Sequence, residues 1–348
     1  MLRHKVSKHT LEFKQPSGTS RGVLKTKDSW FIEVWDVRYP DTIGIGECSI
    51  IKGLSPDPID QIEEELQSLS WDDQGLMSKS KKVIQSFPAI QFAVEMALLD
   101  LQNGGNRILF PSKFTDGLQH IDINGLIWMG ELSFMKAQIK EKIEQGFRCV
   151  KLKIGAIDFE AELSILEGIR KQFSADDIEL RVDANGAFHK DEALEKLKRL
   201  YEYDLHSIEQ PIRQGQIDAM SHLCQLSPLA IALDEELIAV RNTNERENLI
   251  TTIHPQYIIL KPSLVGGLSH AQEWINIAEQ QKVGWWITSA LESNIGLNAI
   301  AQWTAILDTD MYQGLGTGGL YTNNIAAPLY LTGDQLFYNK EGHWGALS

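Results

Sequence analysis

The sequence predicts an α/β protein in which a parallel barrel follows a smaller α+β region. From residue 121 onward, short apolar segments alternate with amphipathic helices, and this alternation is typical of parallel βα units. Eight such apolar segments are present, which matches the strand number of a closed α/β barrel. The first part of the chain has a different texture, with alternating apolar and polar positions followed by helical patterns.

The N-terminal region combines strands with helices, and we predict that it spans residues 1–105. Residues 1 to about 40 alternate apolar and polar side chains, which is the period of half-buried antiparallel strands. Glycines and small hydroxyl residues over 16–25 predict a mobile loop that carries cations between two of these strands. Apolar spacing over 59–69 and 89–101 is helical.

The predicted barrel spans residues 106–319, and residues 320–348 form an irregular return segment. No low-complexity linker separates the barrel from the N-terminal region, so we expect the two to pack tightly. The strand candidates are 120–128, 148–154, 178–183, 206–210, 230–234, 256–261, 284–290 and 311–315. The helices between them include 131–145, 158–173, 190–203 and 268–281.

Composition excludes several classes of partner. The chain of 348 residues carries a net charge of −14 and no basic run, so it would repel nucleic acid and anionic membrane surfaces. Cys48, Cys149 and Cys224 are scattered without metal-site spacing, which indicates neither a disulfide framework nor a zinc site. The basic, polar start and the lack of 18 consecutive apolar residues predict a cytoplasmic protein without a membrane span.

Five charged residues stand near the ends of successive predicted strands: Lys153, Asp183, Glu209, Asp234 and Lys261. They recur at intervals of 25 to 30 residues, about the length of one strand, one helix and two loops. All strands of a parallel barrel end on the same face, so these side chains are expected to converge there.

The three carboxylates among them predict a site for a hard cation. Asp183, Glu209 and Asp234 come from neighbouring strands without imidazole or thiolate beside them, which favours Mg²⁺, with Mn²⁺ as a further candidate. We expect their charges to require such an ion, because clustered carboxylates raise one another's pKa. Alternatively, each acidic residue only caps the helix that follows it.

Two lysines on one strand predict a base inside the barrel. Lys151 and Lys153 are two residues apart, so both side chains point to the same side, and the apolar surroundings place that side in the interior. A solvent-facing pair is the alternative. Burial beside another ammonium group and a cation favours the neutral amine, so Lys153 is the expected base, tuned by Lys151.

Lys261 lies four strands after Lys153, which predicts that the two lysines face each other across the barrel. A substrate carboxylate on the metal, or held by Lys151, would then present its α-carbon between two amines. This arrangement suits abstraction of an α-proton, with the metal stabilising the enediolate that forms.

The chain resembles the enolase superfamily, whose members use a Lys or His base with Mg²⁺. The resemblance extends over nearly the whole chain and implies a modified (β/α)7β TIM-like barrel. It also implies a capping domain built from the N-terminal region and the C-terminal tail. The matching segments are Val150–Lys153, Arg181–Asn185, Ile208–Pro211, Ala232–Glu235 and Leu260–Pro262.

Within the superfamily, the segments at strands seven and eight resemble those of the o-succinylbenzoate synthases of the menaquinone pathway. The His-Asp dyad of the mandelate racemase branch is missing, because Lys261 and Ser289 stand at those strands. Gly314–Gly319 replaces the acidic Asp-x-Asp motif of dipeptide epimerases. Residues 289–298, Arg181 and the loop around Arg21 are similar to those of the synthases.

The resemblance implies a carbon-oxygen lyase, specifically a hydro-lyase that dehydrates 2-succinyl-6-hydroxy-2,4-cyclohexadiene-1-carboxylate to o-succinylbenzoate. Lys153 would remove the α-proton and protonate the departing hydroxyl, while Lys261 stabilises the intermediate by its charge or by a cation–π contact. The residues expected to bind substrate or to support the site are Lys151, Arg181, Asn185, Glu235, Ser289, Glu292, Ser293, Gly316, Thr317, Gly318 and Arg21.

Two alternatives stay open at this point. The same two lysines would serve an N-acylamino acid racemase or a dipeptide epimerase, because each reaction begins with the same proton abstraction. A catalytically silent barrel with a binding or structural role is the second alternative, against which the retained lysines and carboxylates speak. The sequence does not fix the oligomeric state.

Overall fold

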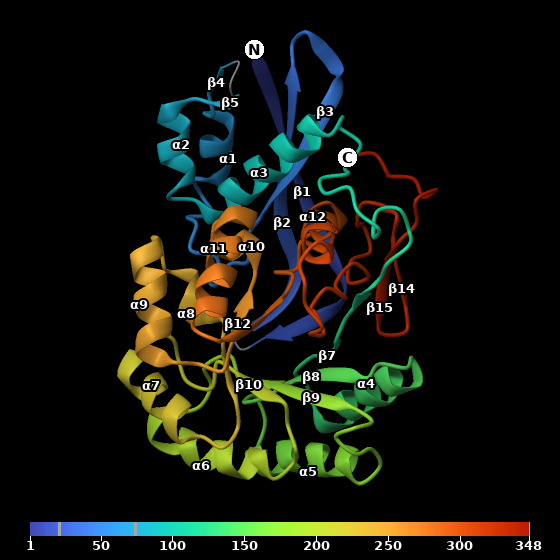
Figure 1. The fold of residues 1–348 in the computed structure, drawn as a ribbon. Helices are drawn as coiled ribbons and strands as arrows, with labels where there is room; N and C mark the ends of the chain where they lie inside the picture. The colour runs from blue at the N-terminus through green and yellow to red at the C-terminus, as the bar shows by residue number, and fades with distance from the viewer. Residues whose placement is uncertain (20–21, 73–74, 348) are drawn as a thin grey trace.

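Three antiparallel strands and three helices form the N-terminal capping region, at the top of Figure 1. The computed structural model describes residues 1–19, 22–72 and 75–347 of the chain. The strands of the main sheet are β1 (Leu2–Thr19), β2 (Gly22–Asp36) and β3 (Tyr39–Ser49). The remaining elements of this region are α1 (Ile62–Gln67), β4 (Trp71–Asp72), β5 (Gly75–Leu76), α2 (Ser78–Ile84) and α3 (Pro88–Gln102).

Strand β2 feeds two hydrophobic cores from its two faces. Trp30 and Ile32 point towards α3 and belong to the core of the capping region. Phe31, between them, belongs to the large core that fills the barrel. The period of two correctly predicts a strand, but the expectation that it is half-buried is wrong for residues 29–32, because the barrel covers the second face.

The prediction of an irregular loop over residues 16–25 is wrong for the part of it that the structure describes. The antiparallel ladder resumes after an irregularity between Glu12 and Ser17, and Ser17 and Gly18 pair with Leu24 and Val23. Continued backbone pairing explains why this segment forms a long hairpin. Arg21, predicted to contact substrate, lies outside the described residues.

A curved parallel sheet forms the second region and confirms the predicted α/β barrel class. Within the described chain the seven hydrogen-bonded strands follow one another in sequence order, with β7 and β13 at the edges. They are β7 (Gly125–Ile127), β8 (Cys149–Lys153), β9 (Glu179–Asp183), β10 (Ser207–Glu209), β11 (Ile231–Leu233), β12 (Tyr257–Leu260) and β13 (Gly284–Ile287).

The predicted eighth strand is reduced to two isolated bridges that close the ring. Gln313 pairs with Ile123 on one side, and Gly314 pairs with Thr288 on the other. The backbone N–H of Gly314 donates to the carbonyl of Ile287 at 2.8 Å, so the chain crosses from one edge of the sheet to the other. Residues 311–315 are therefore no regular strand, because each neighbour is engaged by one residue only.

The predicted strand 120–128 is split into two strands that join different sheets. β6 (Ile121–Asp122) pairs with β15 (Gln335–Tyr338), which also pairs with β14 (Leu329–Thr332). Asn124 separates β6 from β7, and its N–H donates to the carbonyl of Gln313. The segment is split because β6 pairs with β15, whereas β7 pairs with β8 of the parallel sheet.

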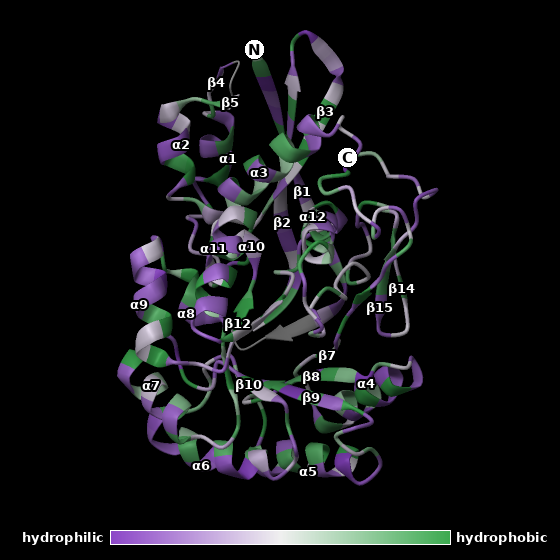
Figure 2. Cartoon of the chain, in the orientation of Figure 1, coloured by the Kyte–Doolittle hydropathy of each residue, from purple (hydrophilic) through white to green (hydrophobic). Residues whose placement is uncertain are grey.

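Helices surround the parallel sheet (Figure 2). They are α4 (Leu132–Glu144), α5 (Phe159–Arg170), α6 (Lys190–Tyr201), α7 (Ile217–Leu226), α8 (Glu235–Ile238), α9 (Thr243–Ile253), α10 (Pro262–Val265), α11 (Gly267–Gln280) and α12 (Asn294–Ala305). The outer helices mix hydrophilic and hydrophobic residues, whereas α8, α10 and most of α12 are buried on all sides. No helix in the described ranges is long and apolar enough to cross a membrane.

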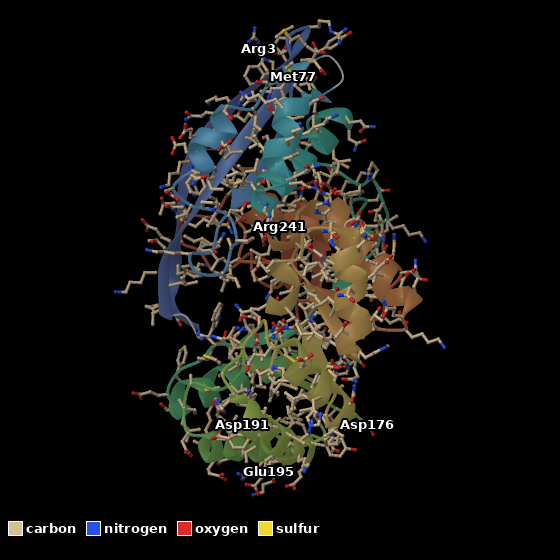
Figure 3. All side chains as sticks on the ribbon, turned by 90° about the vertical axis from the view of Figure 1, so that its left-hand side faces the viewer. Arg3, Met77, Asp176, Asp191, Glu195 and Arg241 are labelled. Atoms are coloured by element: carbon tan, nitrogen blue, oxygen red, sulfur yellow. The ribbon has the colours of Figure 1, made fainter. Side chains whose placement is uncertain are left out.

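The start of the C-terminal segment contacts the capping region, whereas its hairpin joins the barrel side. Tyr321 bridges to Phe13 of β1, and the N–H of Thr322 donates to the carbonyl of Glu12. Arg241, near the middle of Figure 3, donates to the carbonyl of Ser86 at 3.3 Å and links the two regions elsewhere. The boundaries at residues 105 and 319 stay predictions.

Gly46 allows α3 to lie directly against β3. A Cβ atom at this position would meet the backbone carbonyl oxygen of Ala93 at 1.9 Å, a contact that side-chain rotation cannot relieve. The close approach of helix and strand thus depends on the absence of a side chain.

We predict that Gly46→Ala lowers the free energy of unfolding by about 2 kcal/mol, because overpacking forces the backbone of α3 or β3 to shift. Gly168→Ala in α5 is the control, since a Cβ there meets nothing within 4 Å. That substitution is expected to stabilise the helix by up to about 1 kcal/mol. Urea denaturation followed by circular dichroism measures both, and equal effects would show that the α3–β3 contact is not tight.

Candidate active site

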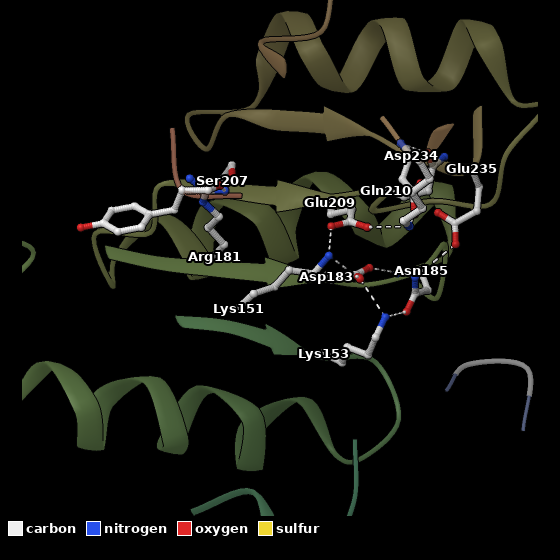
Figure 4. Close-up of polar contacts among 12 residues, drawn as sticks. Lys151, Lys153, Arg181, Asp183, Asn185, Ser207, Glu209, Gln210, Asp234 and Glu235 are labelled. Carbon is white, nitrogen blue, oxygen red and sulfur yellow. Dashed lines mark hydrogen bonds and ion pairs between the residues drawn. The ribbon is translucent and has the colours of Figure 1, made fainter. Parts of the chain in front are cut away.

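Charged side chains gather at the carboxyl ends of the parallel strands, as the spacing predicts (Figure 4). Lys153, Asp183 and Glu209 are the last residues of β8, β9 and β10. Asp234 and Lys261 directly follow β11 and β12. The sheet order places β8 and β12 four strands apart, which confirms that Lys153 and Lys261 stand on different sides of the ring.

Positive and negative groups alternate through this cluster. Lys153 Nζ lies 2.8 Å from Asp183 Oδ2, and Lys151 Nζ lies 3.1 Å from the same oxygen. Lys151 also bonds Glu209 Oε2. Lys261 bonds Asp234 Oδ2 and lies 3.7 Å from Glu209 Oε1. We call this series the charge row; in contact order it runs Lys153, Asp183, Lys151, Glu209, Lys261 and Asp234.

Mutual neutralisation governs the protonation of the charge row. Burial alone would raise the pKa of Asp183, but Lys151 and its neighbouring lysines outweigh burial and hold that pKa far below its usual range. The pKa of Asp234 is lowered for the same reason, chiefly by Lys261. The expectation that three clustered carboxylates require a cation to ionise is therefore wrong for the two aspartates, because the lysines supply the positive charge.

The lysines respond in the opposite direction. Burial would lower the pKa of Lys151 and of Lys261, but the adjacent carboxylates outweigh it and raise both. Lys151, which the sequence predicts to tune Lys153 and to hold a substrate carboxylate, is thus favoured in its charged form while it contacts Asp183 and Glu209. Its charged form is instead suited to holding an anion.

Glu209 is the exception among the carboxylates. Burial and the neighbouring Asp183 raise the pKa of Glu209 to about 8. Its Oε1 is buried and has no hydrogen-bond partner among the described residues. At neutral pH this carboxyl group therefore lacks a full complement of positive charge and donors around it.

The donor chemistry of the cluster fits a hard divalent cation, although lysines now occupy the carboxylate oxygens. Within the described residues, no three His, Cys, Asp or Glu side chains already converge as ligands of one ion. Asp183, Glu209 and Asp234 nevertheless offer oxygen donors only, and Glu209 Oε1 has no hydrogen-bond partner among the described residues, with the amine of Lys261 at 3.7 Å.

Asn185 connects the base candidate to a further acidic residue. Its Oδ1 accepts a hydrogen bond from Lys153 Nζ at 2.7 Å, and its Nδ2 donates to Glu235 Oε1 at 3.1 Å (Figure 4). Its backbone has φ = +44°, a conformation that non-glycine residues rarely adopt. The surrounding contacts therefore hold Asn185 in position beside Lys153.

A cavity of about 410 Å³ opens above the charge row and is enclosed by both regions of the fold. Its predicted site residues are Lys151, Lys153, Asp183, Asn185, Glu235, Lys261, Ser289, Gly316 and Thr317. Apolar side chains from the capping region, including Leu24, Ile51 and Leu54, cover it. The cavity thus combines apolar walls with lysine side chains, which suits a ligand with an apolar body and anionic groups.

Other predicted site residues lie behind the cavity walls. Arg181 is buried inside the barrel, where its guanidinium donates to the carbonyl of Tyr312 and packs over the Trp286 ring at 4.4 Å. Glu292 accepts hydrogen bonds from Ser289 Oγ at 2.6 Å and from Ser263. Ser293 and Gly318 also contribute nothing to the cavity surface that the structure describes.

Sequence reasoning missed two features of the site. Ile51, Lys52 and Leu54 follow β3 and line the cavity, and the signal for them is the Gly- and Pro-containing turn directly after an apolar strand. Gln210 was missed as well. Its Oε1 accepts from the backbone N–H of Asp234 at 3.2 Å and so holds that residue at its strand end.

Comparison with known proteins agrees with this geometry. Residues 135–332 match the family model described as enolase C-terminal domain-like. An o-succinylbenzoate synthase from Desulfotalea psychrophila is 49% identical, over 94% of this chain and 96% of its own. The crystal structure of MenC from Desulfotalea psychrophila superposes with a TM-score of 0.85 at 44% identity, covering 97% of this chain and 99% of that one.

A more distant structure shares the fold. The dipeptide epimerase from Enterococcus faecalis V583, complexed with Mg and the dipeptide L-Leu-L-Tyr, has a TM-score of 0.82 at 19% identity. The alignment covers 97% of both chains. At this identity the likeness concerns the architecture alone.

We predict that Lys151→Met lowers the free energy of unfolding by about 3 kcal/mol at pH 7, because it leaves buried carboxylates without their counter-ion. Wild-type Asp183, with its lowered pKa, contributes stability above the ordinary Asp pKa of about 4 and loses it as the pH falls further. In the Lys151→Met variant, burial favours the protonated form of Asp183. The difference in free energy of unfolding between wild type and variant should therefore shrink as the pH falls from 7 towards 4.

Urea denaturation at pH 7 and pH 4.5, without divalent ions, measures this difference. Lys142→Met is the control, because Lys142 lies on the same cavity but contacts no buried carboxylate; its amine bonds the exposed side chain of Gln145 and lies 4.7 Å from the centre of the Phe147 ring. Its effect should stay below about 1 kcal/mol. Equal losses for both variants would contradict the role of Lys151 in the charge row.

Proposed function

Because the chain belongs to the enolase superfamily, and within it to the o-succinylbenzoate synthase family, we propose how its cavity performs that dehydration. The enzyme is a hydro-lyase that converts 2-succinyl-6-hydroxy-2,4-cyclohexadiene-1-carboxylate to o-succinylbenzoate, a step of menaquinone synthesis. The observation that supports the residue roles is the placement of Lys153 and Lys261 on different sides of one cavity above the charge row. Dipeptide epimerases are only distant relatives, at 22% and 26% identity for two of them.

Lys153 is the base of this proposal. Its amine takes the proton from the carbon beside the ring carboxylate, and the resulting ammonium protonates the hydroxyl that leaves from the same face. One group therefore serves both halves of a syn elimination. Asn185 Oδ1, at 2.7 Å, orients the amine and stabilises its charged form after proton abstraction.

Lys261 and Lys151 supply fixed positive charge. Their raised pKa values keep both amines protonated at neutral pH. The ammonium of Lys261 stabilises the enediolate from the side opposite Lys153, and Lys151 attracts the ring carboxylate. Because both charges are buried, they act in a medium where electrostatic stabilisation is stronger than in water.

Members of this superfamily use a divalent metal ion, and we assign Asp183, Glu209 and Asp234 as its ligands in this chain. Mg²⁺ is the preferred ion because the donors are all carboxylates, and the distantly related epimerase binds Mg. When bound, the ion supplies Lewis-acid charge that makes the α-proton of a carboxylate more acidic. Mn²⁺ has similar ligand preferences and is the second candidate.

The cavity surface supports a small carboxylate substrate. Ser289, Gly316 and Thr317 face the space above the lysines, and Thr317 Oγ1 donates to Ser289 Oγ at 2.9 Å. We propose that these groups contact the ring carboxylate, while the capping residues Ile51 and Leu54 cover the ring. A cytoplasmic location stays a prediction from the sequence.

The deciding experiment incubates the purified protein with Mg²⁺ and each substrate class. Aromatic product absorbance reports dehydration of the cyclohexadiene carboxylate, and optical rotation reports racemisation of N-acylamino acids or dipeptides. Dehydration is expected. Racemisation without dehydration would overturn the proposed function in favour of a racemase, and no turnover of any substrate would favour a silent barrel.

We predict that Lys153→Ala lowers kcat for dehydration at least about 10³-fold, because no other amine stands at the position of the base. Binding of the product should change less than about 10-fold, since Lys151 and Lys261 remain to hold the anion. Stopped-flow absorbance and isothermal titration measure the two quantities. Lys171→Ala, at an exposed ion pair on α5, is the control and should leave both unchanged; full turnover by Lys153→Ala would remove Lys153 as the base.

We further predict that chelation of divalent ions abolishes dehydration and that Mg²⁺ restores it. Without substrate, Mg²⁺ at 100 times its Kd should stabilise the wild type against urea by about 2.7 kcal/mol. Glu209→Gln should lose this response, whereas Asp191→Asn, at an exposed carboxylate, should retain it. A Mg²⁺ response that survives Glu209→Gln would contradict the assignment of Glu209 as a ligand.

A further inference from the structure

Two glutamates of the capping region reach across to the first turns of barrel helices. Glu47 of β3 contacts the start of α12, and Glu95 of α3 contacts the start of α11. A carboxylate at a helix N-terminus accepts backbone N–H groups that the helix itself leaves unpaired, and it interacts favourably with the helix dipole. The two contacts are chemically alike but lead to different parts of the barrel.

Glu47 is fully buried and its two oxygens are filled by donors from both regions. Oε1 accepts from the backbone N–H of Ser293 at 2.8 Å and from Ser29 Oγ, of the capping region, at 2.7 Å. Oε2 accepts from Ser293 Oγ at 2.6 Å and from the backbone N–H of Gly296 at 2.8 Å. The carboxylate thus joins the sheet of the cap to the first turn of α12.

A glycine and a buried lysine lie next to the Glu47 carboxylate. A Cβ atom at Gly296 would meet Glu47 Oε2 at 3.0 Å, so a larger residue would press against the carboxylate. The amine of Lys27 is buried beside Ser49. Burial lowers the pKa of Lys27, and the carboxylates of Glu47 and Glu292 offset part of this effect. Lys27 therefore balances part of the buried negative charge.

The helix start that Glu47 holds is also the end of a cavity wall. Residues 288–293 run from β13 to α12, and Ser289, Ala290 and Leu291 of this segment line the cavity. Its first end is fixed where the N–H of Ser289 donates to the carbonyl of Gly314 at 3.0 Å. Leu291 has φ = +61°, a strained conformation that persists only where the surroundings enforce it.

We propose that Glu47, which does not touch the cavity, is a positioning residue for the dehydration: it fixes the wall of residues 288–293 from the capping region. This inference rests on the proposed function. The middle of this segment is held by Tyr321, whose hydroxyl donates to the carbonyl of Leu291 at 2.6 Å. Glu47 holds the second end of the segment and is its contact with the capping sheet. Displacement of such a wall by about 1 Å is enough to cost on the order of 100-fold in rate.

Glu95 provides a matched control. Its Oε2 accepts from the backbone N–H of Leu268 at 2.7 Å and of Ser269 at 3.2 Å, at the start of α11. No residue of α11 lines the cavity among those that the structure describes. Loss of this carboxylate therefore disturbs the same interface between the two regions without touching residues 288–293.

The test compares Glu47→Gln with Glu95→Gln, both nearly isosteric. Glu47→Gln places an amide donor against donors of Ser29 or Ser293, so kcat/KM for dehydration should fall about 10- to 100-fold on the folded protein. Glu95→Gln should keep kcat/KM within about 3-fold of the wild-type value, even if its melting temperature falls as much as that of Glu47→Gln. Equal losses of kcat/KM in both variants, or retained activity in Glu47→Gln, would overturn the proposal.

Two further measurements keep the test decisive. Ser293→Ala removes one bond to Glu47 together with the cap bond to the N–H of Ile295, and it should lower kcat/KM in the same direction if Glu47→Gln fails to fold. Ser29→Ala, on the capping side, should lower kcat/KM less. Hydrogen exchange of the 288–296 peptide should accelerate in Glu47→Gln and not in Glu95→Gln. Hydrogen exchange does not depend on turnover, so it tests the contact of Glu47 separately from the proposed function. An inactive wild-type protein would refute the proposed function. Unchanged exchange in Glu47→Gln would refute the proposal that Glu47 holds residues 288–293.

Discussion

The alternation of charge along the charge row is the constraint on which the rest of the site depends. Six ionisable groups are placed at or near strand ends, and four of them, Lys151, Asp183, Glu209 and Asp234, are buried, where an isolated charge would be very costly. Each lysine lies against carboxylates of other strands. These contacts lower the pKa of Asp183 and Asp234 and raise the pKa of Lys151 and Lys261, whereas the pKa of Glu209 is raised by burial. Because balance requires every partner, the register of β8, β9 and β10 has little freedom to slip.

The charge row also explains how amines and carboxylates can lie side by side in one site. While lysines cover the carboxylates, the amines are engaged; a cation on the carboxylates would take over their neutralising role and leave the amines to face a substrate. The high pKa of Glu209 marks the place where the balance is incomplete. The cavity above the row is completed by apolar residues of the capping region, so the two regions contribute chemistry and enclosure respectively.

Enclosure depends on contacts between regions that are far apart in sequence. The core of the barrel includes Phe31 and Phe92 of the capping region, and Glu47 and Glu95 reach helix starts that lie more than a hundred residues further along the chain. Since proton abstraction is common to synthases and epimerases, the walls rather than the lysines select the reaction. A residue that holds a cavity wall in place, as Glu47 holds residues 288–293, therefore affects the rate of the reaction without touching the substrate.

The sequence by itself determined the βα repeat, the strand ends that carry Lys153, Asp183, Glu209, Asp234 and Lys261, and their convergence on one face, because periodicity and parallel strand direction are local properties. The tertiary structure decided what depends on partners distant in sequence. It reduced the eighth strand to bridges at Gln313 and Gly314, paired residues 17–19 with residues 22–24, and placed Arg181 beneath the cavity. It also showed that lysines neutralise the aspartates, since a pKa is set by the charges that folding brings within a few ångströms.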